Sequence, residues 1–229
     1  MDSELTSVTQ KLVKAWKFFY RRGFVDGFGH ISARVHSNDH FLLSRHALTS
    51  KVSADDFILL DLAGNCMSAQ LALPAELPIH LEIYKRRPDV ASIAHFHCLF
   101  STSFTMSDIA LKPAYFLASI FRTGIPIHPD SRLISDAERG SALAETLGKC
   151  RAALLKAHGV VVTGASVEEM VAGAFILEDN AHRAWISASM GELQVLDEDT
   201  MSEIEADILK SKGAFRRIWA LCEEDASKE

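Results

Sequence analysis

Residues 94–98, with the sequence AHFHC, hold the histidines whose spacing most directly suggests chemistry. Side chains of a strand alternate between its two faces, so His95 and His97 would point the same way and Phe96 the other way. Two imidazoles on one face lie about 6–7 Å apart along the strand, within reach of one divalent metal ion. The pair alone does not decide for a metal site, because two of the ten histidines could also share this spacing by chance.

His158 is the third candidate ligand. It lies in KAHGVV at residues 156–161, where a tight turn is expected between two apolar strands. A side chain in a turn at a sheet edge can reach across to a neighbouring strand. Three neutral imidazoles leave coordination positions of a divalent ion open, which is typical of catalytic rather than structural metal sites.

Glu76 is the candidate for the general acid or base. It follows Pro74 and Ala75 in an expected first helical turn, where unpaired backbone N–H groups and the helix dipole favour negative charge. That position also fits ordinary charge complementarity at a helix start. Together with His158, however, the carboxylate favours a metal site over a chance histidine pair. His80, one turn later, could lie behind the ligands and support them, but a lone histidine on a helix face more often serves packing, so it is left out of the ligand set.

Helices interleaved with short strands would position these residues. Hydrophobic spacing and capping residues predict helices over about residues 3–22 and 74–88, from Ser135, from Ser166 to Met190, and over residues 204–219, before an acidic tail from about residue 223. Strands are predicted at residues 30–35, 41–44, 57–61, 90–97, 153–157 and 160–163. This pattern predicts an α/β fold: a single α/β/α layered domain over residues 1–229, with a mostly antiparallel or mixed sheet.

The composition excludes several classes of function. The 229 residues are 48% hydrophobic and 24% charged, and the net charge of −6 argues against a nucleic-acid or anionic-membrane surface. No apolar stretch approaches 18 residues, and the N-terminal segment lacks the pattern of a signal peptide. The four cysteines are far apart and contain no CxxC pair. We therefore expect a cytoplasmic protein.

Other catalytic motifs are incomplete or missing from the sequence. Gly27 and Gly29 begin a dinucleotide-binding fingerprint, but Ser32 stands in place of its third glycine. There is no phosphate-binding P-loop, no HExxH and no GxSxG. An amidohydrolase barrel also carries HxH on a strand, but it needs a longer chain with regular alternation. A cupin would be dominated by strands, whereas several helices are expected here.

Three segments resemble the class II aldolase/adducin family: GHISARV at residues 29–35, PAELPIHLEIYKRRPDVASIAHFH at 74–97 and KAHGVVVTG at 156–164. The resemblance extends over about residues 8–190. It implies an α/β/α fold with a central, mainly antiparallel sheet, and a homotetramer with active sites at subunit interfaces. It also implies a divalent ion held by His95, His97 and His158, with Glu76 as acid/base. The ligands do not choose among Zn²⁺, Mn²⁺, Co²⁺ and Fe²⁺, and whether Glu76 also binds the ion stays open.

The departures from the family pattern bear on the substrate. Family aldolases acting on sugar phosphates usually carry a Gly-Asn pair in the first loop and a Ser-Ser pair before the glutamate. This chain has His30 in that loop, and Pro74 and Ala75 replace the hydroxyl pair. Proline lacks a donor N–H and alanine has no hydroxyl, so a phosphate would be poorly held. We therefore expect an unphosphorylated substrate.

The loop GHISAR, with FLLSRHAL at residues 41–48, resembles family branches that decarboxylate hydroxylated aromatic or heteroaromatic acids. Arg45 could bind a carboxylate through a pair of hydrogen bonds, although it also fits an ordinary surface charge. His30, Ser44 and His46 could hold hydroxyl or carboxylate groups of the substrate.

Three functions remain, in order of preference. The first is a decarboxylase of a hydroxylated carboxylate. The second is an aldolase or retro-aldolase of an unphosphorylated hydroxy-keto compound, in which Tyr115 would act as proton donor at a neighbouring subunit's site. The third is a non-catalytic scaffold like adducin; adducin-like members lack the metal histidines, whereas this chain has all three.

Overall fold

A seven-stranded sheet forms the centre of the computed structural model, which describes residues 3–35, 39–67 and 71–228. Its strands, in spatial order, are β3 (Phe57–Asp61), β2 (His40–Ser44), β1 (His30–Val35), β4 (Ser92–Phe96), β7 (Gly159–Gly164), β6 (Ala152–Leu155) and β5 (Ile127–His128). Neighbouring strands are antiparallel except for the parallel pair β5 and β6. The expected mainly antiparallel sheet is confirmed.

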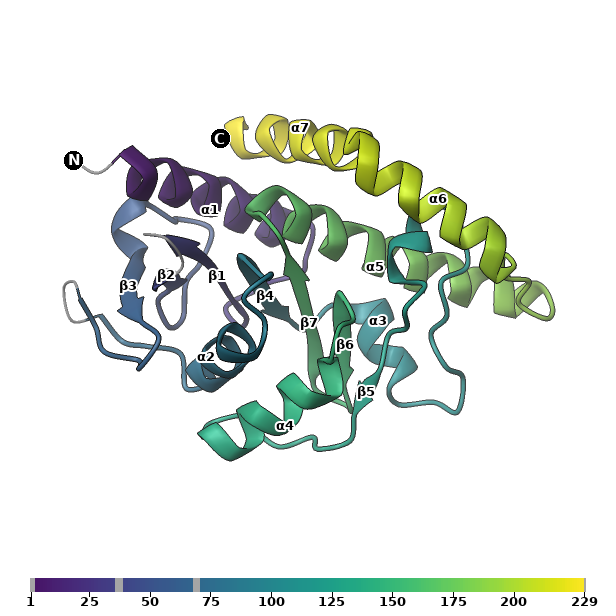
Figure 1. Cartoon of the computed structure of the whole chain (residues 1–229), viewed down its shortest axis with the longest axis horizontal. Helices are drawn as coiled ribbons and strands as arrows, with labels where there is room; N and C mark the ends of the chain where they lie inside the picture. Colours follow the sequence, from purple (N-terminus) through teal and green to yellow (C-terminus); the bar gives the residue numbers. More distant parts are fainter. Residues whose placement is uncertain (1–2, 36–38, 68–70, 229) are drawn as a thin grey trace.

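Helices cover both faces of this sheet (Figure 1). One side carries α1 (Ser3–Arg21) and α5 (Val167–Met190), and the other carries α2 (Leu77–Arg86) and α4 (Ala137–Leu147). Each face has its own apolar core, one around Trp16 and Phe96, the other around Tyr84 and Ile93. The predicted α/β/α layering is therefore confirmed. None of the helices in the described residues is long and apolar enough to span a membrane.

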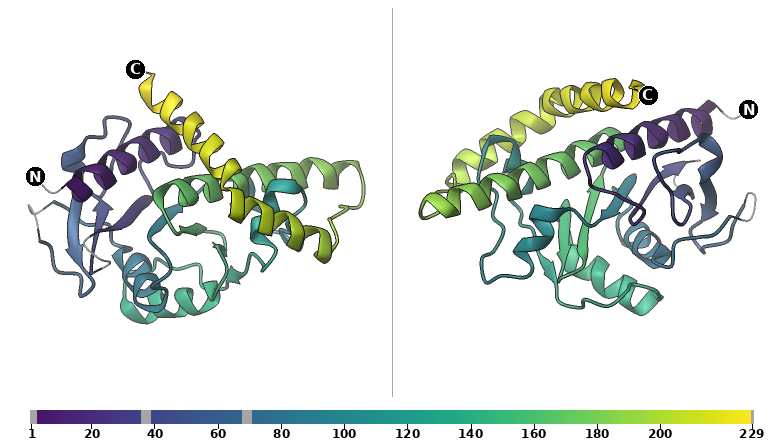
Figure 2. Two further views of the ribbon diagram at one scale, coloured as in Figure 1. Left: turned by 45° about the horizontal axis from the view of Figure 1, so that its top comes forward. Right: turned by 180° about the vertical axis from the view of Figure 1, so that it is seen from behind.

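The remaining helices connect or cover these layers. They are η1 (Ala54–Asp56), α3 (Leu99–Phe104), η2 (Phe116–Phe121), α6 (Glu198–Ser211) and α7 (Gly213–Ser227). Figure 2 shows α7 lying over α1 and α5, with which it is in contact. This adds a further helix on the outside of that face.

The long helix α5 begins and ends as its sequence predicts. The Ser166 side chain accepts a hydrogen bond from the backbone N–H of Glu169 at 3.2 Å, and Gly191 follows the last helical residue with φ 157°. The start of α4 differs from the prediction by one residue. Asp136, not Ser135, is the capping residue, and its carboxylate accepts from the backbone N–H of Arg139. A carboxylate satisfies that N–H with a charge as well as a hydrogen bond.

Two predictions for the C-terminal region are wrong. The expected last helix is two helices, because Lys212 adopts φ 53° and separates α6 from α7. The expected acidic tail is part of α7, which continues to Ser227. Two acidic residues of α7 form ion pairs with basic residues at α1. Glu223 lies 2.6 Å from Lys14, which is within α1, and Asp225 lies 2.8 Å from Arg22, which directly follows α1. Phe215, Ile218 and Cys222 bury the apolar face of α7, and the ion pairs add a smaller contribution to its docking.

Candidate metal centre

His95 and His97 lie at the end of the central strand β4. The strand ends at Phe96, so His95 is its penultimate residue and His97 follows it directly. The two Nε2 atoms are 3.2 Å apart, and the rings are nearly perpendicular at 85°. His95 is fully buried, whereas His97, just beyond the carboxyl end of β4, is partly exposed. The pair therefore presents its nitrogens to one point, as the HxH pattern predicts.

His158 reaches the same point from the turn between β6 and β7. Ala157 precedes it with φ 51°, and the backbone N–H of Ala157 donates to Thr105 Oγ1 at 2.8 Å. After the turn the chain passes very close to β4, because a Cβ atom on Gly159 would lie 2.6 Å from a ring carbon of His97. Glycine is thus required at position 159 for the turn to approach the histidines.

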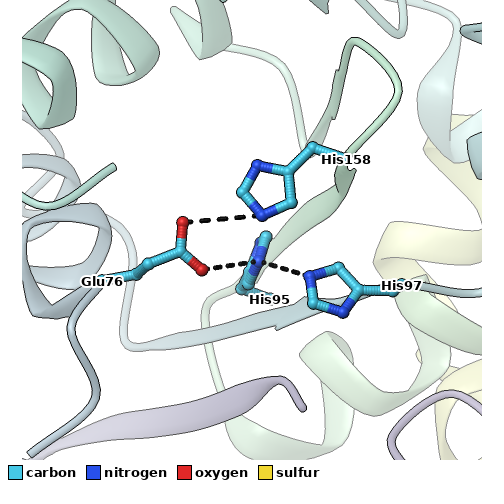
Figure 3. Close-up of side chains that lie close together, drawn as sticks. All are labelled: Glu76, His95, His97 and His158. Atoms are coloured by element: carbon cyan, nitrogen blue, oxygen red, sulfur yellow. Dashed lines mark hydrogen bonds and ion pairs between the residues drawn. The ribbon is translucent and has the colours of Figure 1, made fainter. Parts of the chain in front are cut away.

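Glu76 completes the group from the residue before α2. It is the N-cap residue rather than part of the first turn, and its Oε1 accepts the buried backbone N–H of Ile134 at 3.0 Å. Its Oε2 lies 3.3 Å from His95 Nε2, and its Oε1 lies 3.6 Å from His158 Nε2 (Figure 3). The carboxylate is held by the backbone on one side and faces the imidazoles on the other.

Burial and mutual contact set the charges of this group. Burial lowers the pKa of His95 to about 4, and burial together with the neighbouring His95 and His158 lowers that of His97 to about 4. Burial acts to raise the pKa of Glu76, but contacts with His158, His30 and His95 outweigh it and hold that pKa well below its usual range. At neutral pH the group therefore consists of an ionised carboxylate and neutral imidazoles at His95 and His97.

This donor set fits a divalent cation. One ligand atom from each of Glu76, His95, His97 and His158 can be chosen so that all four lie within 4.8 Å of one another. Neutral imidazole nitrogens and an ionised carboxylate oxygen are the ligands that Zn²⁺ and similar ions take in catalytic sites. Because these ligands are already deprotonated, metal binding does not require the free energy of removing protons from them.

His30 lies beside this group, as the register of the sheet requires. His30 and His95 are paired across β1 and β4, and their rings stack with centroids 4.9 Å apart. His30 Nε2 is 3.7 Å from Glu76 Oε2. His80 is not among the four and is fully buried behind His30, with its Nε2 2.6 Å from His30 Nδ1. Burial lowers the pKa of both His30 and His80.

The other residues expected to bind substrate have different surroundings. Ser44 is buried, and its hydroxyl accepts the backbone N–H of Ile31 at 3.0 Å. Arg45 Nε donates to Asp56 Oδ1 at 2.5 Å, and His46 is exposed. None of these described contacts reaches the metal-ligand group, so their substrate roles stay predictions.

Tyr115 lies away from this group, on the side of α5. It precedes η2, and the guanidinium of Arg183 lies 4.8 Å from the centre of its ring. Burial and the nearby carboxylate of Asp179 raise the pKa of Tyr115. A role as proton donor would have to be at another subunit's site, as the resemblance implies, and it stays a prediction.

Phe28 is a further residue at the site, and the sequence alone does not single it out. Its ring is 6.2 Å from that of His97, and 70% of the residue is exposed. The GFG pattern around it suggests only nucleotide binding, and an exposed aromatic residue in a loop carries no other sequence signal. Its position over His97 becomes visible only when the loop is placed against β4.

Comparison with known proteins identifies the family. Residues 10–185 match the family described as Class II Aldolase and Adducin N-terminal domain. The chain belongs to the class II aldolase and adducin family. In that family, 3,4-dihydroxyphthalate decarboxylase of Arthrobacter keyseri is 25% identical over 210 residues, covering 85% of each chain. L-fuculose phosphate aldolase of Methanococcus vannielii is 26% identical over 174 residues, covering 75% of this chain and 92% of the relative.

A solved structure of the class II aldolase family has the same fold. L-fuculose 1-phosphate aldolase from Glaciozyma antarctica superposes with a TM-score of 0.82 at 21% identity, covering 99% of this chain and 94% of that one. The family predicted from sequence is therefore confirmed. Both relatives named above are carbon–carbon lyases, which supports a lyase. Class II aldolases generally depend on a divalent metal, and this chain carries a matching His and Glu group.

Proposed function

We propose that this chain is a carbon–carbon lyase that uses a divalent metal ion held by His95, His97 and His158. The observation that carries the proposal is the convergence of these three imidazoles and the Glu76 carboxylate on one point. Zn²⁺ and Mn²⁺ are the first candidates, followed by Co²⁺ and Fe²⁺. The exposed side of His97 leaves the group open to a substrate.

Both aldol cleavage and decarboxylation leave an electron pair that must come to rest on an oxygen next to the broken bond. A divalent ion, when bound, supplies positive charge that stabilises this developing oxygen anion. The Glu76 carboxylate lies among the ligand nitrogens, where we propose that it accepts the proton of a substrate hydroxyl before the bond breaks. The protonated carboxyl group can then return that proton to the carbanion carbon.

We favour decarboxylation of a hydroxylated, aromatic or heteroaromatic carboxylate. The relative from Arthrobacter keyseri, which is similar to this chain over 85% of its length, is named as a decarboxylase of such an acid. Phe28 offers an exposed ring beside His97, against which a flat substrate could stack. Pro74 has no backbone N–H and Ala75 has no side-chain hydroxyl, so neither offers the donor that family members use to hold a phosphate. His30, Ser44, Arg45 and His46 are proposed to bind polar groups of the substrate, and Arg45 would exchange its bond to Asp56 for a carboxylate.

An aldolase acting on an unphosphorylated hydroxy-keto compound is the second candidate. The family relative from Methanococcus vannielii, named as an aldolase, favours it. Tyr115 would then protonate or deprotonate the substrate at the site of a neighbouring subunit. An adducin-like scaffold is the least favoured candidate, because a scaffold has no use for three imidazoles converging with a carboxylate.

We propose that the chain assembles into a homotetramer whose active sites lie at subunit interfaces. Large apolar side chains are exposed over α3 and the end of α5: Leu99 is 71%, Trp185 57% and Met190 77% exposed. Between α3 and α5 lies a largely apolar hollow of about 570 Å³. A second copy of the chain would remove this surface from water. Size-exclusion chromatography with light scattering measures the assembly.

The products decide between the two enzymatic candidates. The protein, loaded with Mn²⁺ or Zn²⁺, would be incubated with a panel of hydroxy-aromatic and sugar-derived acids, and CO₂, aldehydes and ketones would be measured in the same wells. CO₂ release that is lost in His97→Ala supports the decarboxylase. Carbonyl products without CO₂ support the aldolase. No product and no bound metal would contradict the lyase proposal.

A further inference from the structure

A continuous row of buried polar side chains leads from the metal group into the protein. His30 Nδ1 is 2.6 Å from His80 Nε2, and His80 Nδ1 is 2.6 Å from Ser32 Oγ. Ser32 Oγ is in turn 2.7 Å from the hydroxyl of Tyr84. All four residues are buried, none more than 4% exposed. We call this row the histidine chain.

The histidine chain is built from two elements that face each other across one core layer. His30 and Ser32 are two residues apart on β1 and so lie on one face of the strand. His80 and Tyr84 are four residues apart on α2 and so lie on one face of the helix. The four residues alternate between strand and helix, and each link crosses from one element to the other.

Donation can run in two directions along the histidine chain, and each direction leaves one end donor without a hydrogen-bond partner in the described chain. If Tyr84 O–H donates to Ser32, Ser32 donates to His80 Nδ1, and His80 Nε2–H donates to His30 Nδ1. Neutral His30 then carries its proton on Nε2, facing the Glu76 carboxylate 3.7 Å away. In the reverse direction the Tyr84 proton would have no acceptor among its described hydrogen bonds, and a bare His30 lone pair would face the carboxylate. The first direction is preferred, because its unpartnered N–H faces the ionised Glu76 carboxylate, whereas the reverse direction turns a lone pair toward that carboxylate and leaves the buried Tyr84 O–H without an acceptor.

We infer that Tyr84, Ser32 and His80 are positioning residues that hold His30 as its Nε2–H tautomer, an N–H donor for an anionic oxygen of the substrate beside the metal group. This inference rests on the proposed lyase function. His30 Nε2 is buried with no hydrogen-bond partner in the described chain, because 3.7 Å exceeds an ordinary hydrogen bond. A buried donor without an acceptor is a place for a ligand oxygen. The recognised chemistry is a carboxylate, enolate or phenolate oxygen.

The histidine chain fixes a tautomer rather than conducting protons. If His30 gave its Nε2 proton to the substrate and received a replacement on Nδ1 through the histidine chain, Tyr84 would end as a buried tyrosinate. Burial raises the pKa of Tyr84, so that state is disfavoured. The guanidinium of Arg34 lies 4.5 Å from the centre of the Tyr84 ring, and it donates to the backbone carbonyl of Tyr84 at 2.6 Å. Both contacts hold the end of the chain in place.

The tautomer of His30 can be read directly by ¹⁵N magic-angle-spinning NMR of protein labelled at histidine. Metal-free and Zn²⁺-loaded samples would be compared, and the His30 signals identified by their loss in His30→Gln. We expect a protonated Nε2 and an unprotonated, hydrogen-bonded Nδ1 in the wild type. A proton on Nδ1 of the wild-type His30 would overturn the inference.

Ser32→Ala removes the hydroxyl that donates to His80 Nδ1, and Ser119→Ala removes a buried hydroxyl outside the histidine chain as a matched control. Without that donor, His80 can carry its proton on either nitrogen, so we expect Ser32→Ala to produce a mixture of His30 tautomers and to lower kcat/KM about fivefold to tenfold at unchanged metal content. Ser119→Ala should change neither the tautomer nor kcat/KM. An unchanged tautomer in folded Ser32→Ala would contradict the inference. The tautomer is read without turnover, so an inactive wild type contradicts the proposed function and leaves the tautomer result standing.

Discussion

The Nε2 atoms of His95 and His97 lie 3.2 Å apart, although side chains two residues apart on a strand are spaced about 6–7 Å along its axis. The approach arises because β4 ends at Phe96, so that the ring of His97 turns back toward that of His95 at 85°. Without a metal ion the two neutral rings can share one hydrogen bond, from the N–H of one to the lone pair of the other. A shared cation would give each of them a ligand role.

Removing a proposed ligand should remove metal and activity together. We expect His97→Ala, at the exposed edge of the group, to bind much less Zn²⁺ or Mn²⁺ and to lose essentially all turnover while staying folded. Metal content by inductively coupled plasma spectrometry and the product assay test this. His182→Ala, at an exposed histidine outside the group, is the matched control and should keep its metal. Full activity of metal-free His97→Ala would remove His97 from the site.

Glu76→Gln separates proton transfer from metal binding. The amide keeps the shape and one oxygen of the side chain, so the metal should remain, whereas an amide cannot accept the substrate's proton. We expect turnover to fall by about 100-fold or more, measured as initial rates at saturating metal. A Glu76→Gln protein with wild-type rates would show that another group moves the proton.

Gly159→Ala tests the close approach of the His158 turn. The added methyl would lie 2.6 Å from both His97 Cδ2 and the carbonyl oxygen of Phe96, so β7 must shift away from the histidines. We expect weaker metal binding and a loss of about 1–3 kcal/mol in unfolding free energy. Gly213→Ala, where the nearest atom would be 3.6 Å away, is the control and should be tolerated. Equal metal affinity in Gly159→Ala and Gly213→Ala would contradict the account of this turn.

The buried histidines should make the metal-free protein less stable in mild acid. The pKa of His95 and of His97 is about 4 in the folded protein, against the ordinary histidine value of 6.5 in the unfolded chain. Between these two values the unfolded chain therefore binds more protons. The free energy of unfolding should fall as the pH is lowered from about 6.5 toward 4, by up to about 1.4 kcal/mol per pH unit for the fully buried His95.

Denaturant unfolding at several pH values, with a chelator present, measures this dependence. Above pH 4.5 the Glu76 carboxylate contributes little to the slope, because its pKa is lowered in the folded protein and its contribution is lost only below the usual value of 4.5. The slope should be smaller in His95→Gln than in the wild type. Identical slopes would mean that His95 is not buried as a neutral imidazole.

Local sequence patterns predicted the parts of the fold that local rules control. The alternation of His95, Phe96 and His97 on a strand placed the two histidines together and Phe96 in the opposite core, and the capping pair at Ser166 marked the start of α5. The choice of Asp136 over Ser135 shows the limit of such rules. Two adjacent residues could both cap the helix, and only the path of the incoming chain decides between them.

The features of the fold and the site that the sequence did not predict depend on contacts between segments far apart in sequence. The sequence left His80 between packing and a place behind the ligands, and its bond to His30, 50 residues away, arises because α2 lies against β1. The acidic end of the chain was predicted as a tail, because the sequence around it does not indicate that Arg22 and Lys14, about 200 residues earlier, form ion pairs with it. Such pairings follow from how the layers stack, which hydrophobic periodicity does not specify.

The most direct test of the central claim is an anomalous-diffraction experiment on crystals of the Mn²⁺-loaded protein, with data on both sides of the manganese absorption edge. The account predicts one strong edge-dependent peak per chain, within bonding distance of the imidazoles of His95, His97 and His158, which disappears in His97→Ala. A fully active protein with no peak between these residues, or with its manganese held elsewhere, would contradict the account.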